Sequence, residues 1–219
     1  MALVLRGYYA ILNLQGEAPE ESAALLARAE ERLAARPACL QLRAKCMGAA
    51  DLRRTAALLL PACRGAGVPL LVNDRLDVAL AAGADGVHLG QDDLPLTDAL
   101  RIRAGQGLII GVSTHNLAQA QAAWRDGADY IGFGPIFATQ TKADAEAAVG
   151  LAKLREVCAA VPLPVVAIGG ITLATANAVS ATGASAAAVI SPIDQARDPV
   201  ATARQVAAAF ATRAPQART

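Results

Sequence analysis

Short apolar segments alternate along the chain with longer alanine-rich segments in which apolar residues recur at helical spacing. The helical segments, each with its charges on one face, include residues 20–35, 51–66, 117–126, 147–160 and 199–212. The apolar runs, typical of strands buried on both faces, are 8–14, 39–43, 69–72, 86–89, 108–112, 130–133, 165–168 and 186–190. Strands that alternate with helices predict βαβ units and therefore a parallel sheet.

Eight strands in a chain of 219 residues fit an α/β fold of the (β/α)8 TIM barrel type, built as a single domain. We assign residues 1–212 to this barrel and expect residues 213–219 to be a disordered tail. An open doubly wound sheet is the alternative, but it normally carries a glycine-rich turn after its first strand. The segment from Asn13 to Gly16 lacks that fingerprint.

The composition narrows the range of folds, partners and sites that fit the chain. Aromatic residues make up only 3% of the chain, so we expect an aliphatic barrel interior. A net charge of +1 argues against nucleic acid as a partner. The four cysteines form no Cys-x-x-Cys pair and only two histidines are present, which favours free thiols over a zinc site. Without an apolar run of membrane-helix length or a signal-peptide pattern, we expect a cytoplasmic protein that does not bind membranes.

The tripeptide Gly-Ala-Asp occurs at 83–85 and again at 127–129, each time between a helix and the next strand. Residues 183–185 form a looser third copy. Glycine suits the end of a helix, where φ is positive, so the repeat predicts two glycine helix caps.

Polar residues are concentrated at the predicted carboxyl ends of the strands, where barrels of this kind build their active sites. The second strand ends in Gln-x-Arg-x-Lys, and alternation puts Gln41, Arg43 and Lys45 on one face. Two cations in a barrel mouth are costly unless an anion neutralises them. We therefore predict an anion site, with Arg43 as a bidentate fork and Lys45 as a point charge. Solvated charges at a strand end are the alternative.

Carboxylates follow the next two strands. Asp74 comes directly after the third strand, and Asp93 lies just beyond the fourth. Mg²⁺ prefers one or two carboxylates together with water and substrate phosphate oxygens, so the pair predicts a magnesium site. Alternatively, Asp93 or its neighbour Asp92 caps the following helix.

Two further strand ends, those of the fifth and sixth strands, carry residues suited to phosphate. Ser113 is a candidate ligand-binding residue or an ordinary helix cap, and His115 is interpreted as a surface or capping residue. The loop after the sixth strand contains Thr139, Thr141 and Lys142, although a flexible polar loop would look similar.

The ends of the seventh and eighth strands carry Gly169-Gly170 and Ser191, and barrel enzymes often bind phosphate at these two strands. The pattern thus predicts two anion sites. One lies near strands two to five with a metal and suits a diphosphate, and the other is a metal-free monophosphate site.

Taken in order, these motifs resemble those of the thiamine phosphate synthase family, and the likeness runs from Tyr9 to Phe210. Beside the Gln-x-Arg-x-Lys strand, it rests on Val-Asn-Asp-Arg at 72–75 and His-Leu-Gly-Gln-Asp-Asp at 88–93. Further along come Gly-Val-Ser-Thr-His at 111–115, the segment 134–142, and Ile-Gly-Gly-Ile at 168–171.

The resemblance implies an Mg²⁺-dependent transferase. It would join hydroxymethylpyrimidine diphosphate to hydroxyethylthiazole phosphate, or to the carboxylated form of that phosphate. Pyrophosphate would leave first, by a dissociative route that needs no general base. Asp74 and Asp93 are then the metal ligands, and Arg43, Lys45, Ser113 and Lys142 the catalytic residues. The implied substrate-binding residues are Gln41, Arg43, Lys45, Asn73, Ser113, Thr139, Thr141, Lys142, Gly170, Ile190 and Ser191.

Three positions depart from the family pattern: Asn13 replaces an aspartate, Ala138 a proline and Ala186 a glycine. The rival interpretations are a thiazole tautomerase on a similar barrel, a non-catalytic sensor of the thiamine pathway, and a phosphate-binding barrel of another pathway. The oligomeric state is left open, and a homo-oligomer is compatible with the sequence.

Overall fold

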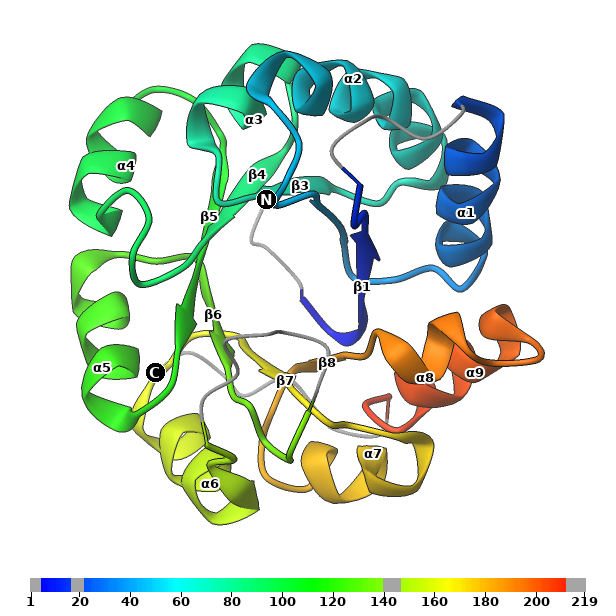
Figure 1. Cartoon of the computed structure of the whole chain (residues 1–219). Coiled ribbons are helices and arrows are strands. Elements are labelled where there is room, and N and C mark those ends of the chain that lie inside the picture. Colours follow the sequence, from blue (N-terminus) through cyan, green and yellow to red (C-terminus); the bar gives the residue numbers. More distant parts are fainter. Residues whose placement is uncertain (1–4, 17–21, 140–146, 212–219) are drawn as a thin grey trace.

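Eight parallel strands close into a barrel in sequence order, from β1 beside β2 round to β8 beside β1 (Figure 1). The computed structural model describes residues 5–16, 22–139 and 147–211. The strands are β1 Gly7–Asn13, β2 Leu40–Arg43, β3 Leu70–Asn73, β4 Gly86–Leu89, β5 Ile109–Thr114, β6 Tyr130–Phe133, β7 Val165–Ile168 and β8 Ala186–Ala188. This topology confirms the predicted (β/α)8 barrel.

The helices form a ring outside the strands (Figure 1). Their bounds are α1 Ser22–Ala34, α2 Ala49–Ala66, α3 Leu76–Ala82, α4 Leu96–Arg103, α5 Leu117–Asp126, α6 Gly150–Ala160, α7 Leu173–Ser180, α8 Ser191–Asp194 and α9 Pro199–Ala208. Within the described ranges, none of these helices is long and apolar enough to cross a membrane.

Some boundaries differ from the sequence prediction. The strand β8 ends at Ala188 instead of 190, because the chain turns there into the short helix α8. The helix α6 begins at Gly150 instead of 147, and α2 begins at Ala49 instead of 51. The predicted tail, 213–219, lies outside the described residues.

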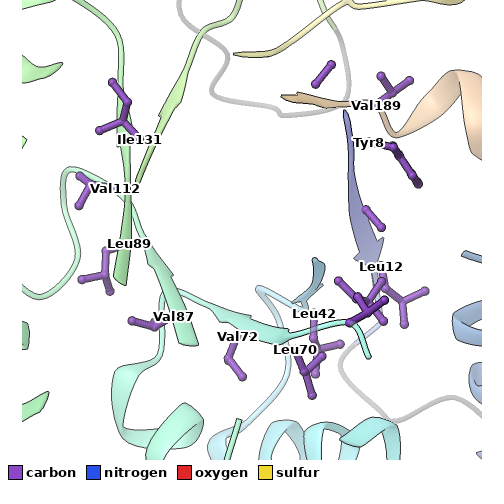
Figure 2. Packing of buried hydrophobic residues seen from close by; sticks show 14 of the residues in the cluster. Tyr8, Leu12, Leu42, Leu70, Val72, Val87, Leu89, Val112, Ile131 and Val189 are labelled. Atoms are coloured by element: carbon purple, nitrogen blue, oxygen red, sulfur yellow. The ribbon is translucent and has the colours of Figure 1, made fainter. Parts of the chain in front are cut away.

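Alternation along each strand separates two buried layers. The outer side chains point away from the barrel axis and pack against the helices, as Figure 2 shows for Tyr8, Leu12, Leu42, Val72 and Ile131. Because a strand exposes successive side chains to opposite faces, their neighbours point inward. The outer layer is mainly aliphatic and supplies most of the apolar burial that stabilises the fold.

The inner layer differs from the predicted aliphatic filling. Two of the three tyrosines, Tyr9 and Tyr130, are buried inside the barrel beside Cys39 and small alanines. The polar side chain of Gln41 is buried on this face too. The predicted aliphatic interior is therefore confirmed only in part: Ile11, Leu71 and Val166 belong to this layer, but tyrosine rings and the Gln41 side chain share it.

The two Gly-Ala-Asp tripeptides have the same structure. Gly83 and Gly127 end α3 and α5 with φ of 69° and 96°, which confirms the predicted glycine caps. The Asp85 and Asp129 carboxylates then each accept a hydrogen bond of 2.8 Å from a backbone amide near the start of the preceding strand, that of Leu70 in β3 and that of Ile110 in β5. The repeat thus fastens successive strands together at the end of the barrel opposite to the predicted site.

Candidate active site

A pocket opens among inward-pointing residues at and near the carboxyl ends of the strands. Five of the predicted binding residues line it: Gln41, Arg43, Asn73, Ser113 and Ile190. They come from β2, β3, β5 and the turn after β8, so the barrel brings together positions that are far apart in the sequence. The other lining residues are Tyr9, Ile11, His88, Tyr130, Gly132, Val166, Ile168 and Ala188.

The cation of Arg43 is held at the pocket wall by Asn13. Arg43 donates a hydrogen bond of 2.6 Å to the side-chain oxygen of Asn13, whose backbone carbonyl accepts one of 3.2 Å from Arg28. Asn13 was one of the departures from the family pattern. Here it orients the guanidinium without neutralising it, because its amide carries no charge. Lys45 lies past the end of β2 and is exposed.

Two carboxyl groups meet beside these cations. Burial raises the pKa of Asp74 to about 6, and a hydrogen bond and charge repulsion from Asp93 add to the increase. The charges of Lys45 and Arg43 act in the opposite direction. The helix-cap alternative for Asp93 is wrong, because Pro95 precedes α4 and Asp93 instead accepts a 2.6 Å hydrogen bond from the Gly90 amide.

The backbone at Asp74 supports this convergence. Its φ is 64°, in the left-handed region that aspartate and asparagine tolerate better than other residues with a side chain. Its amide donates a hydrogen bond of 2.8 Å to the His88 carbonyl on the neighbouring strand β4. This turn places the carboxyl group beside Asp93. Among the described residues, no third acidic residue, histidine or cysteine completes a larger metal-binding cluster.

Ser113 belongs to a chain of hydrogen bonds that crosses the barrel interior. Its hydroxyl lies 2.9 Å from Nε2 of His88, and Nδ1 of His88 lies 2.8 Å from the Tyr130 hydroxyl. The Tyr130 and Tyr9 hydroxyls are 2.8 Å apart, and Gln41 donates to Tyr9 at 2.9 Å. Ser113 is therefore not a helix cap.

The cap of α5 is Asn116, whose side chain accepts a hydrogen bond from the Gln119 amide. His115 is also not the surface or capping residue predicted from the sequence. It is half-buried, and its Nδ1 lies 2.6 Å from the Gly134 carbonyl at the end of β6. It therefore fastens the loop after β6 to β5.

Sequence reasoning missed Tyr9, Tyr130 and His88 as site residues. His88 stood within a motif used for the family resemblance, but no role was assigned to it. Alternation was the available signal, because Tyr9 shares a face with Asn13, and Tyr130 lies two residues before Gly132, which also lines the pocket.

The glycines after β7 have a structural purpose. Gly169 and Gly170 adopt φ of 97° and 63°. A Cβ atom on Gly170 would lie 2.6 Å from the Ala138 carbonyl oxygen, and Phe137 donates a 3.0 Å hydrogen bond to the Gly169 carbonyl. The loops after β6 and β7 thus pack backbone against backbone, a contact that a side chain would prevent.

Two further predicted residues, Thr139 and Ser191, follow the carboxyl ends of β6 and β8. Thr139 is half-buried near the end of the described part of the loop after β6. Ser191 begins α8, which is anchored because Asp194 forms an ion pair with buried Arg32 of α1. Thr141 and Lys142 lie outside the described residues.

Comparisons with known proteins agree with the predicted resemblance. The family described as "Thiamine monophosphate synthase" matches residues 9–193. A thiamine-phosphate synthase of Chloroflexus aurantiacus is 55% identical over 145 residues, which cover 66% of each chain. One of Methanocella arvoryzae is 52% identical over 169 residues, which cover 77% of this chain and 79% of the relative.

The solved structure of a thiamine phosphate pyrophosphorylase from Pyrococcus furiosus superposes with a TM-score of 0.81 at 32% sequence identity. The superposition covers 95% of this chain and 96% of that one. Motifs, fold and relatives agree over nearly the whole barrel, and the chain belongs to the thiamine monophosphate synthase family.

Proposed function

We propose that this enzyme is a thiamine phosphate synthase that transfers the hydroxymethylpyrimidine group from its diphosphate to hydroxyethylthiazole phosphate or the carboxylated form of that phosphate. The products are thiamine phosphate and pyrophosphate. Family membership and relatives that are named thiamine-phosphate synthase support the reaction class, which is that of a transferase.

The observation that carries the proposal is the paired carboxyl groups of Asp74 and Asp93 beside Arg43 and Lys45. Two carboxylates that repel one another, with cations next to them, suit a divalent ion and a multiply charged phosphate group. A site for a neutral ligand would have no use for this arrangement.

The residues fit magnesium, because their oxygens are the hard ligands it prefers, and waters and phosphate oxygens would complete its coordination. Asp74 and Asp93 would hold the ion. When bound, Mg²⁺ supplies neutralisation of charge on the departing pyrophosphate.

The side chains of this protein supply the remaining stabilisation. Arg43, oriented by Asn13, and Lys45 face the diphosphate and stabilise the charge that develops as the bond to the methylene carbon breaks. Lys142 is assigned the same role. Gln41, Asn73 and Ser113 hold the pyrimidine diphosphate in the pocket, so that the cationic pyrimidine fragment stays oriented until the thiazole nitrogen attacks it.

The thiazole phosphate is assigned to the opposite wall. Thr139, Thr141, Gly170, Ile190 and Ser191 surround it in this proposal. The tight packing of the loops after β6 and β7 supports the assignment, because it holds the backbone on that side in one conformation. No proton needs to be removed from a carbon atom, so the mechanism requires no general base.

The rival functions account for less of the site. A thiazole tautomerase would need no carboxylate pair for a diphosphate, and a non-catalytic sensor would need no residues that stabilise a leaving group. A barrel of another phosphate pathway leaves the Gln-x-Arg-x-Lys strand without a purpose.

The distinguishing experiment mixes purified protein with hydroxymethylpyrimidine diphosphate, hydroxyethylthiazole phosphate and Mg²⁺. Thiamine phosphate is followed by its oxidation to a fluorescent thiochrome. We expect product with Mg²⁺ and none with EDTA. Folded protein that binds both substrates without joining them would support the sensor, and isomerisation of a thiazole phosphate alone would support the tautomerase.

The carboxyl pair predicts a pH dependence of magnesium binding. The Asp74 pKa of about 6 means that the metal-free group keeps its proton up to that pH, so Mg²⁺ must displace it. Affinity should therefore fall as the pH drops through about 6, and binding should release protons there but hardly any at about pH 8. Calorimetry in two buffers of different ionisation enthalpy measures this release. Proton release that is unchanged in Asp74→Asn would contradict the assignment.

Asn13 should control the affinity for the diphosphate. Asn13→Ala removes the acceptor that orients Arg43, so we expect the KM for the pyrimidine diphosphate to rise about ten-fold with a smaller change in kcat. Asn13→Asp keeps an acceptor in place and serves as the matched variant, with a KM nearer to that of the wild type. Steady-state kinetics with the thiazole phosphate saturating measures both. Equal KM values in the wild type and Asn13→Ala would show that Asn13 does not position Arg43.

A further inference from the structure

Hydrogen bonds link Gln41, Tyr9, Tyr130, His88 and Ser113 into a chain across the barrel. The donors and acceptors of these side chains fix which atom donates in each bond. Gln41 donates its amide hydrogen to the Tyr9 oxygen. Tyr9 has a single hydroxyl proton, and its strongest available acceptor is the Tyr130 oxygen, 2.8 Å away. Its other neighbour, the Cys39 sulfur, is a weaker acceptor. Tyr9 therefore donates to Tyr130.

The direction of hydrogen-bond donation continues from Tyr130 toward the pocket. Tyr130, having accepted from Tyr9, donates its own proton to Nδ1 of His88. A neutral imidazole whose Nδ1 accepts must carry its proton on Nε2, which then donates to the Ser113 oxygen at 2.9 Å. The Ser113 hydroxyl proton consequently has to point elsewhere, and the pocket lies beside it.

Burial keeps the tyrosine hydroxyls of this hydrogen-bond chain protonated. It raises the pKa of both Tyr9 and Tyr130 well above the usual value, so both hydroxyls stay protonated near neutral pH. Gly111 leaves room for the Tyr130 ring, with which a Cβ atom at 111 would overlap. Gly132 leaves room for the His88 ring, which would lie 3.1 Å from a Cβ atom at 132.

We propose that Gln41, Tyr9 and Tyr130 act as positioning residues that fix His88 as the Nε2–H tautomer and so make Ser113 a hydrogen-bond donor toward the substrate. The inference deepens the proposed function, because the group that receives the Ser113 proton would be an acceptor atom of the pyrimidine diphosphate. The protein would thereby prefer a ligand with an acceptor at this place over one with a donor.

The protein contains an internal reference for testing the tautomer of His88. Its second histidine, His115, lies with Nδ1 2.6 Å from the Gly134 carbonyl, an acceptor only, so His115 must carry a proton on Nδ1. Long-range ¹H–¹⁵N correlation spectra at about pH 8, above the usual histidine range, should show one ring of each tautomer. His115→Gln identifies which signals belong to His88. An Nδ1–H tautomer or a mixture at His88 in the wild type would overturn the proposal.

Variants test whether the tyrosines impose the tautomer. Tyr130→Phe removes the donor to His88, and Tyr9→Phe breaks the chain one step further away, which provides a second variant if one folds poorly. Either should shift His88 toward a mixture of tautomers. The matched control is Tyr8→Phe, because the buried Tyr8 hydroxyl has no hydrogen-bond partner in the described part of the chain. His88 spectra that are unchanged in Tyr9→Phe and Tyr130→Phe would refute the proposed role of the hydrogen-bond chain.

Kinetics test whether the chain acts through Ser113. In the wild type, Tyr130→Phe should lower kcat/KM about ten-fold, whereas in a Ser113→Ala background it should lower it less than about two-fold. Equal losses in both backgrounds would show that Tyr130 acts independently of Ser113. The spectra of the substrate-free protein do not depend on turnover. Failure of the proposed hydrogen-bond chain can therefore be told apart from failure of the proposed synthase activity.

Discussion

Asp74→Asn should lower thiamine phosphate formation about a thousand-fold at saturating Mg²⁺, because one of the two carboxylates proposed to hold the metal is lost. Asparagine tolerates the φ of 64° at this position, so the fold should survive. Rates at several Mg²⁺ concentrations, with circular dichroism as the check on folding, provide the measurement.

The control for this variant is Asp92→Asn, which removes an exposed carboxylate from the same loop as Asp93. We expect its activity to stay within about two-fold of wild type, since surface substitutions have small effects. Near-normal turnover of Asp74→Asn at saturating Mg²⁺ would rule out the proposed role of Asp74. Equal losses in the two variants would mean that the overall charge of the region matters instead of a specific ligand.

Gly111→Ala should destabilise the protein by about 1–3 kcal/mol and greatly reduce its activity. A Cβ atom at 111 would overlap with the ring of Tyr130, which is fully buried and held by hydrogen bonds through its hydroxyl. Displacement of that ring would also break its hydrogen bonds to Tyr9 and His88. Urea unfolding together with steady-state kinetics measures both effects.

Gly107→Ala is the matched control, because a Cβ atom there would meet no atom within 4 Å. The double variant Gly111→Ala/Tyr130→Ala should be more stable than the sum of the two single losses predicts, since removing the ring removes the overlap. Additive losses in the double variant would mean that the Tyr130 ring is not what excludes a side chain at 111.

The barrel was predictable because its signals are local and repeated. Apolar runs of strand length alternate with amphipathic helices, and the glycines at 83 and 127 mark helix ends by a conformation that other residues avoid. The end of β8 was not predictable, because Val189 and Ile190 are as apolar as the strand residues before them. Only the turn into α8 removes them from the sheet.

The site was predictable where charge was the signal. Arg43 and Asp74 are polar residues at strand ends, so each stands out in the sequence. The inner hydrogen-bond chain was not predictable, because a tyrosine inside an apolar run looks the same whether it faces the helices, as Tyr8 does, or the pocket, as Tyr9 does. The role of Asn13 depends on its contact with Arg43 across two strands, which no local pattern encodes.

The most direct test of the proposed Mg²⁺-dependent synthase reaction measures thiamine phosphate and pyrophosphate together during one reaction. The protein receives both substrates with Mg²⁺, then EDTA in excess, then Mg²⁺ in excess over EDTA. We expect equimolar release of the two products, an immediate stop with EDTA and full recovery when Mg²⁺ returns. Pyrophosphate released without thiamine phosphate, or coupling that continues unchanged in EDTA, would contradict the proposed Mg²⁺-dependent synthase reaction.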